Sequence, residues 1–339
     1  MPWDRGRPRP PSFVSKERAW TPAVPGLILL LALSLTGCVA ERLAPGPGPT
    51  APQFTDSGHW RAADGFTLAH SEWQTESPKT VIVALHGMND YGRFISDAAL
   101  YWQKQGITTY AFDQRGFGRT EGNGRWPGHD VMAADVATFV GLVRLRHPGA
   151  RIFLLGESMG GAVATLAAAR TGPKLADGLI LVSPAYWGWS NLDIVKRAAL
   201  WTMMQLAPGS RLTGRGLNIR PSDNEKMLIA LGQDPYVIKA TRIDATYGLV
   251  DLMDEAWKSA PDVAMPTLVL YAKGDEVVPS APIEQAVSRM KGPRRYVCYS
   301  DGFHMLLRDL KAERTWREVA GFAQGPIQPD ESVARACSN

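Results

Sequence analysis

The chain has few cysteines, little net charge and no internal repeats. Its 3 cysteines in 339 residues exclude the small disulfide-dense scaffolds. The 37 basic and 33 acidic side chains give a net charge of +4, and most of that excess lies in residues 1–37, so nothing suggests a nucleic-acid partner. A hydrophobic content of 45% and a charged content of 21% are typical of a globular protein that buries a large core.

The first 37 residues have the pattern of a secretion signal. A basic, proline-rich stretch precedes the apolar run 24–35, which is too short to span a membrane comfortably but suits the core of a signal peptide. The run leads into Leu-Thr-Gly-Cys at 35–38, which resembles a bacterial lipobox and implies cleavage before Cys38 and lipidation of its thiol. A plain secretory signal and an uncleaved membrane anchor are the alternatives.

The residue after the lipobox cysteine bears on location. Val39 stands where an aspartate tends to retain such lipoproteins at the inner membrane. We therefore expect a protein of the bacterial cell envelope, anchored by its lipid at the periplasmic face of the outer membrane.

Composition divides the rest of the chain into three parts. Residues 38–57 are rich in proline and glycine and predict a stiff spacer that holds a folded domain off a membrane. Residues 58–324 carry the regular apolar patterns of one domain. Residues 325–339 predict a disordered tail.

The two remaining cysteines lie far apart in the sequence. Cys298 lies in a strand-like segment and Cys337 in the tail. An oxidising compartment would permit a disulfide between them, but the apolar setting of Cys298 favours a buried free thiol.

Continuous apolar runs alternate with helical patterns across the domain. An alternating segment at 60–73 predicts early antiparallel strands. Runs typical of buried strands lie at 80–85, 107–112, 151–155, 179–183, 267–271 and 295–299. Helical patterns fall at 96–105, 128–147, 159–170, 279–290 and 310–322. This alternation predicts an α/β fold with a mostly parallel central sheet covered by helices on both faces.

One segment departs from the alternation. Residues 186–260 show helical spacing with no strand pattern and are rich in tryptophan and methionine. Inserted after a strand, this segment predicts a helical cap that roofs an apolar site. Additional core helices without a substrate role are the alternative.

A G-x-S-x-G motif at 156–160 joins a strand pattern to a helix of small residues. Glycines on both sides permit a sharp, strained turn that would raise the hydroxyl of Ser158 above the sheet edge, next to a helix N-terminus. The motif alone also fits an ordinary tight turn. Its position between strand and helix makes Ser158 the candidate nucleophile.

A serine nucleophile needs a base and an acid that orients the base. The expected chain order for this kind of turn is serine, acid, histidine. Asp275 and His304 follow the last two strand patterns, where ligand sites of open α/β sheets gather. Asp301 or Glu276 could supply the acid instead, and the other five histidines precede the serine.

The developing oxyanion needs two backbone N–H donors. We expect one from Met159, directly after the serine, and one from Met88, in the loop after the strand at 80–85. Removing one such donor costs about 3 kcal/mol of transition-state stabilisation. His86 is predicted to order this loop and to take no part in the chemistry.

Five motifs in combination resemble the α/β-hydrolases of the monoacylglycerol lipase and lysophospholipase group, over about residues 58–322. They are His86-Gly87, Asp113 to Gly118, the serine motif, Gly274-Asp275 and Phe303-His304. The resemblance implies an α/β-hydrolase fold with a helical cap, ester hydrolysis on singly acylated lipids, and no cofactor or metal. It also implies the roles of nucleophile, acid, base and oxyanion donors for Ser158, Asp275, His304, and Met88 with Met159.

The sequence thus predicts a serine ester hydrolase that acts on monoacylglycerol or lysophospholipid through an acyl-enzyme and is held at a membrane by a lipid on Cys38. An acyltransferase or an aminopeptidase on the same core, and an inactive lipid-binding scaffold, are the alternatives. The acyl-chain length, the head group and the oligomeric state stay open.

Overall fold

The computed structural model describes residues 40–55, 58–214, 216, 218–326 and 337. Contacts divide the chain into residues 1–39 and residues 40–339, and only the second part is described. The predicted signal peptide, Cys38 and nearly all of the predicted tail lie outside the described residues. Among the helices that are described, none has the length and apolar character needed to cross a bilayer.

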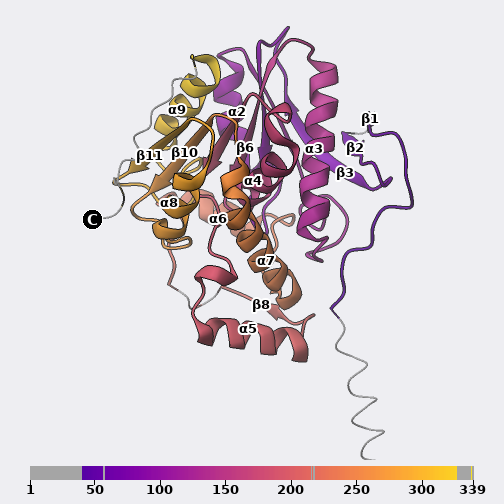
Figure 1. The fold of residues 1–339 in the computed structure, drawn as a ribbon, viewed down its shortest axis with the longest axis vertical. Coiled ribbons are helices and arrows are strands. Elements are labelled where there is room, and N and C mark those ends of the chain that lie inside the picture. Colours follow the sequence, from indigo (N-terminus) through magenta and orange to yellow (C-terminus); the bar gives the residue numbers. More distant parts are fainter. Residues whose placement is uncertain (1–39, 56–57, 215, 217, 327–336, 338–339) are drawn as a thin grey trace, which may run out of the picture. The chain divides into compact units, whose positions relative to one another are not determined.

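A nine-stranded sheet forms the centre of the domain, in the order β1-β2-β3-β5-β4-β6-β7-β10-β11 (Figure 1). Six neighbouring strands pair in parallel, namely β5, β4, β6, β7, β10 and β11. Strands β1, β2 and β3 form an antiparallel edge, as predicted. The strands are β1 Gln53–Thr55, β2 His59–Arg61, β3 Thr67–Trp73, β4 Thr80–Leu85, β5 Ile107–Phe112, β6 Arg151–Glu157, β7 Gly178–Val182, β10 Thr267–Ala272 and β11 Arg294–Tyr299.

Helices cover both faces of this sheet, which explains why its central strands read as continuous apolar runs. In β4, Val81 and Val83 pack with helices of one face, whereas Ile82 packs with helices of the other. The first face carries α3 His129–Arg146, α4 Met159–Thr171, α7 Ile243–Ser259 and α8 Ser280–Arg289. The second face carries α2 Ser96–Gln103 and α9 Ala312–Gln324.

The segment predicted as a helical cap over 186–260 differs from the prediction in two respects. It contains the short antiparallel strands β8 Arg211–Leu212 and β9 Thr241–Arg242, besides helices α5 Ile194–Leu206 and α6 Glu225–Gln233. Its last part, α7, belongs to the core, because it buries an apolar stripe against α4. By contrast, all 13 residues of α5, each of them described, are exposed or half-buried.

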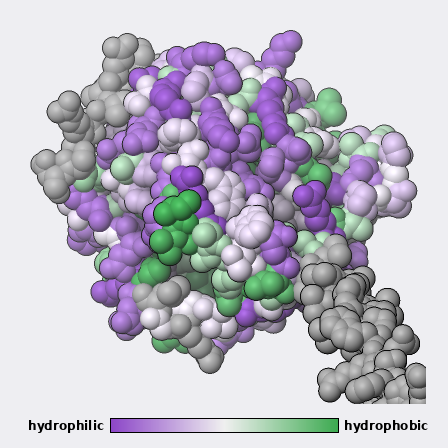
Figure 2. Space-filling view, turned by 60° about the horizontal axis from the view of Figure 1, so that its bottom comes forward, coloured by the Kyte–Doolittle hydropathy of each residue, from purple (hydrophilic) through white to green (hydrophobic). Residues whose placement is uncertain are grey.

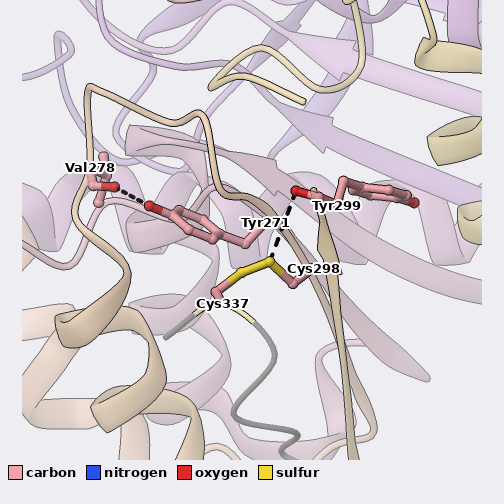
Figure 3. The surroundings of a disulfide bond; sticks show 5 residues. All are labelled: Tyr271, Val278, Cys298, Tyr299 and Cys337. Atoms are coloured by element: carbon pink, nitrogen blue, oxygen red, sulfur yellow. Dashed lines mark hydrogen bonds between the residues drawn. A yellow bond between two sulfur atoms is a disulfide. The ribbon is translucent and has the colours of Figure 1, made fainter. Parts of the chain in front are cut away.

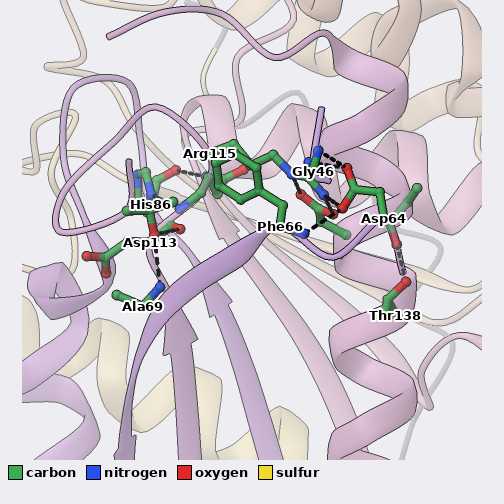
Figure 4. A network of polar contacts seen from close by, with 12 residues as sticks. Gly46, Asp64, Phe66, Ala69, His86, Asp113, Arg115 and Thr138 are labelled. Carbon is green, nitrogen blue, oxygen red and sulfur yellow. Dashed lines mark hydrogen bonds and ion pairs between the residues drawn. The ribbon is translucent and has the colours of Figure 1, made fainter. Parts of the chain in front are cut away.

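Residues 43–50, here called the strap, lie on the domain, although the sequence predicted a spacer. Leu43 N donates to Trp126 O over 3.1 Å, and Thr50 N donates to Ala63 O over 2.9 Å. Gly46 N donates to the carboxylate of Asp64, which also binds Arg115 (Figure 4). A β-carbon at Gly46 would collide with the backbone of the Asp64 turn, so a glycine is required there. At Gly46 the glycine therefore reflects close packing rather than extension.

Cys298 and Cys337 form a disulfide, with their Cα atoms 5.9 Å apart (Figure 3). The prediction of a free thiol at Cys298 is wrong. β11 is the edge strand of the sheet, and Cys298 on it is only half-buried, so a residue from the tail can reach its sulfur.

Candidate active site

Ser158 occupies the turn between β6 and α4 with φ 53° and ψ −118°, a strained backbone conformation. Its amide donates to Val182 O over 3.0 Å, which ties the turn to β7. A β-carbon at Gly160 would lie 2.8 Å from His86 O, so this glycine allows α4 to begin directly against the end of β4. The strand–turn–helix geometry expected of a nucleophile turn is thus present.

The loop after β4 lies directly against this serine. A β-carbon at Gly87 would be 3.3 Å from Ser158 Cβ and 3.9 Å from Ser158 Oγ. Met88, the expected second oxyanion donor, is the next residue of this loop. Met159 is fully buried as the first residue of α4, where amide groups have no partner inside the helix.

His86 orders this loop from within the core. Its Nδ1 contacts Gly87 O at 2.8 Å, and its Nε2 accepts from Gln114 N over 2.9 Å. A neutral ring that donates from Nδ1 satisfies both contacts. Burial lowers the pKa of His86, which favours that neutral form.

Asp275 and His304 form a buried pair at the carboxyl ends of β10 and β11. His304 Nδ1 lies 2.8 Å from Asp275 Oδ2, and the two side chains are 8% and 0% exposed. Because an ionised carboxylate only accepts, Nδ1 carries the proton and Nε2 is left as a base. The other oxygen of Asp275 accepts from Val277 N and Val278 N over 2.8 and 3.0 Å, which fixes the carboxylate.

The two alternative acids bind elsewhere. Asp301 is exposed and pairs with Lys311 and Arg314. Glu276 accepts from Arg220 N in the cap over 2.8 Å. Asp275 is therefore the carboxylate that orients His304.

Arg308 lies among these loops and was not found from the sequence. Its Nη1 lies 2.7 Å from Asp90 Oδ2, and its Nη2 lies 3.1 Å from Glu157 Oε2. All three side chains are at most 8% exposed. Burial raises the pKa of Glu157, and the charge of Arg308 opposes that rise. We call Arg308, Asp90 and Glu157 the Arg308 cluster.

A cleft of about 440 Å³ lies on the cap, between α5 and α7. Its walls are mainly apolar and include Trp189, Trp201 and Tyr247, with Arg197 as the charged residue. Helix α5 also exposes apolar side chains, with Ile194 75% and Val195 72% exposed. Figure 2, which brings this end of the domain forward, shows apolar side chains gathered on the surface there. Within the described residues, no group of three or more His, Cys, Asp or Glu side chains is arranged to hold a metal ion.

The fold and the serine turn define an α/β-hydrolase. The chain belongs to the family described as serine aminopeptidase, S33 (Hydrolase_4), which it matches over residues 76–311. It is 26% identical over 283 residues to a monoglyceride lipase of Homo sapiens, with 80% of this chain and 90% of the human protein covered. It is 27% identical over 233 residues to a monoacylglycerol lipase of Mycolicibacterium smegmatis, with 67% and 81% covered.

Solved structures share the fold. A monoacylglycerol lipase from Paleococcus ferrophilus superposes with a TM-score of 0.62 at 21% identity, covering 76% of this chain and 98% of the other. A soluble variant of monoglyceride lipase from Saccharomyces cerevisiae gives a TM-score of 0.66 at 16% identity, covering 83% and 98%. With the family match, these relatives place the chain among the carboxylic ester hydrolases of the monoacylglycerol lipase group.

Proposed function

We propose that this protein hydrolyses the ester of singly acylated lipids, monoacylglycerol or lysophospholipid, through Ser158, Asp275 and His304. The observation that carries the proposal is the buried Asp275–His304 pair, which follows β10 and β11 of the same sheet whose strand β6 ends in the strained serine turn. The monoacylglycerol lipases to which the chain is similar support the substrate class. The apolar cleft on the cap is lined by none of the three proposed catalytic residues, so the substrate class rests on the relatives.

In this mechanism Ser158 Oγ attacks the ester carbonyl while His304 Nε2 takes the hydroxyl proton. Asp275 stabilises the imidazolium, and the amides of Met88 and Met159 donate to the oxyanion. His304 then gives its proton to the leaving alcohol, so that an acyl-enzyme remains on Ser158. Water activated by His304 attacks this ester and releases the fatty acid.

Ser158→Ala tests the chemistry. The variant should fold normally and lose hydrolysis of a p-nitrophenyl acyl ester by at least about 10⁴-fold, because the nucleophile is gone. It should also fail to react with a fluorophosphonate probe that labels the wild-type protein. Undiminished turnover in Ser158→Ala would remove this serine from the mechanism.

A panel of monoacylglycerols, lysophospholipids and short-chain esters tests the substrate class. The protein used should keep residues 39–52, because the strap is part of the folded domain. Long-chain monoacyl lipids should give the largest kcat/KM. A clear preference for short, water-soluble esters would contradict the assignment to lipids.

Aminopeptidase activity is the second candidate, because the matching family is described as serine aminopeptidase. The same serine and histidine would then cleave an amide. Aminoacyl arylamides tested beside the esters separate the two, and a kcat/KM for arylamides above that for monoacyl lipids would favour the peptidase.

We further propose that Cys38 carries a lipid that anchors the protein at the periplasmic face of the bacterial outer membrane. The Cys298–Cys337 disulfide supports an exported protein, because such bonds persist in oxidising compartments. The strap shortens the tether: Leu43 is bound to the domain, only five residues after Cys38. Labelled palmitate should enter the protein, and persistence of the label in Cys38→Ser would refute lipidation there.

A further inference from the structure

We propose that Arg308 is a positioning residue that fixes three segments relative to one another. They are the serine turn at 157–159, the oxyanion loop at 86–90 and the histidine loop at 303–309. The inference rests on the proposed serine mechanism and adds a residue that does not itself touch the substrate. It starts from the fact that one buried side chain reaches two of these loops while its own backbone belongs to the third.

The first arm holds the oxyanion loop. Arg308 Nη1 binds Asp90 Oδ2 over 2.7 Å, and the other oxygen of Asp90 accepts from Tyr91 N over 2.8 Å. Asp90 N in turn donates to Gly87 O over 3.3 Å, which closes the short turn containing Met88. A shift of the Asp90 carboxylate would therefore move the proposed oxyanion donor.

The second arm holds the serine turn. Arg308 Nη2 binds Glu157 Oε2 over 3.1 Å, and Glu157 directly precedes Ser158. The other oxygen, Glu157 Oε1, has no hydrogen-bond partner among the described residues, so the guanidinium is what anchors this side chain there. The strained backbone of Ser158 starts from a residue that Arg308 restrains.

The backbone of Arg308 belongs to the histidine loop. Arg308 N donates to Met305 O over 2.8 Å, which closes a tight turn after His304. The next residue, Asp309, accepts from Phe303 N over 2.9 Å and so binds the other side of the histidine. The base and the guanidinium therefore move together.

Only an arginine meets these requirements. A guanidinium presents several N–H groups in a rigid plane and can bond two carboxylates in fixed directions, whereas a lysine ammonium is a point charge on a flexible stem. Reacting groups in an enzyme must be held closely, and a displacement of about 1 Å costs about 100-fold in rate. The cluster supplies that restraint through the two ion pairs of Arg308.

The test uses the full chain with Arg308→Met, Arg308→Lys and the neutral triple variant Arg308→Met/Asp90→Asn/Glu157→Gln. The triple variant leaves no unpaired buried charge, so it separates folding from positioning. Serines competent to react are counted by end-point labelling with a fluorophosphonate, and kcat and KM are measured per labelled serine. The matched control is Arg115→Met, which removes another buried arginine bound to two carboxylates, Asp64 and Asp135, neither of which belongs to the three loops.

We expect kcat to fall about 10- to 100-fold in Arg308→Met and in the triple variant, with KM changed less than about threefold. Arg308→Lys should recover part of the loss, and Arg115→Met should keep the wild-type kcat per labelled serine. Wild-type kcat in the triple variant would overturn the proposal. If that variant does not fold, wild-type kcat in Arg308→Lys overturns it equally. Absence of labelling in the wild-type protein would instead refute the serine mechanism itself.

Discussion

Two buried arginines of this protein each bind two carboxylates, yet they join different parts of the fold. Arg115 binds Asp64 and Asp135 with four contacts of 2.6 to 2.9 Å. Arg308 binds Asp90 and Glu157. Arg115, Asp64 and Asp135, here called the Arg115 cluster, join the loop after β5 to α3 and, through Asp64, to the strap. None of these segments carries a candidate catalytic residue, whereas the Arg308 cluster joins the loops of the candidate site. The same local chemistry therefore serves stability in one place and geometry in the other, depending on which backbone segments it connects.

The largest difference between the candidate site and the Arg115 cluster should appear when one aspartate of each is replaced and kcat and stability are compared. Asp275→Asn should lower kcat about 10⁴-fold with little change in melting temperature, because the amide favours the wrong histidine tautomer. Asp135→Asn, in the Arg115 cluster, should lower stability and leave kcat per labelled serine unchanged. Ester hydrolysis measures kcat, and thermal unfolding measures the stability of both variants. A fully active Asp275→Asn would show that the buried pair has no catalytic role.

Unfolding measurements extend the contrast to the arginines. Arg115→Met should lower the free energy of unfolding by about 3–5 kcal/mol, since it leaves the buried carboxylate of Asp135 without its partner. Arg308→Met should lose a comparable amount for the same reason. Urea denaturation measures both losses. If the two variants lose equal stability but only Arg308→Met loses kcat, Arg308 has a positioning role that Arg115 lacks. If both variants lose stability and kcat to the same extent, the two arginines do not differ in role.

The same contrast explains what the sequence could and could not predict. The strands and the candidate residues Ser158, Asp275 and His304 follow from local patterns: apolar runs, a turn motif and loop positions after strands. The Arg308 cluster joins single charges separated by 151 and 218 residues, with no periodicity to mark them. An acidic residue inside the serine motif, Glu157, was the one available sign, because a charge at the end of a buried strand needs a partner.

The strap and the disulfide escaped prediction for a related reason. Proline and glycine are common in spacers, and the sequence does not show that Gly46 fits against the turn at Asp64. The partner of Cys298 comes from a tail without any regular pattern. In both cases the decisive contact is long-range, and local composition carries no information about it.

Gly46→Ala tests the scaffold side on a smaller scale. The added β-carbon would collide with the Asp64 turn, so the strap should detach locally and the free energy of unfolding should fall by about 1–3 kcal/mol. The kcat should not change, because the hydrogen bonds that hold the strap go to Trp126, Ala63 and Asp64, outside the loops of the candidate site. Denaturation and limited proteolysis near residue 46 measure the effect. Gly48→Ala is the control, since a β-carbon there meets nothing within 4 Å, although its φ of +149° carries some strain of its own.

The smallest expected effect is a pH dependence confined to the Arg115 cluster. The hydrogen bond from Arg115 holds the pKa of Asp64 below its ordinary value of 3.8. An acid whose pKa is lower in the folded state stabilises the fold above its unfolded pKa and loses that contribution as the pH falls. The stability difference between the wild-type protein and Asp64→Asn should therefore be present at neutral pH and shrink below about pH 4. A third of the Asp64 side chain is exposed, so solvent screening keeps the change small. Urea denaturation from pH 7 to pH 3 measures it, and a difference that grows as the pH falls from 3.8 to 3 would contradict the assignment of Asp64 as the ionised partner of Arg115.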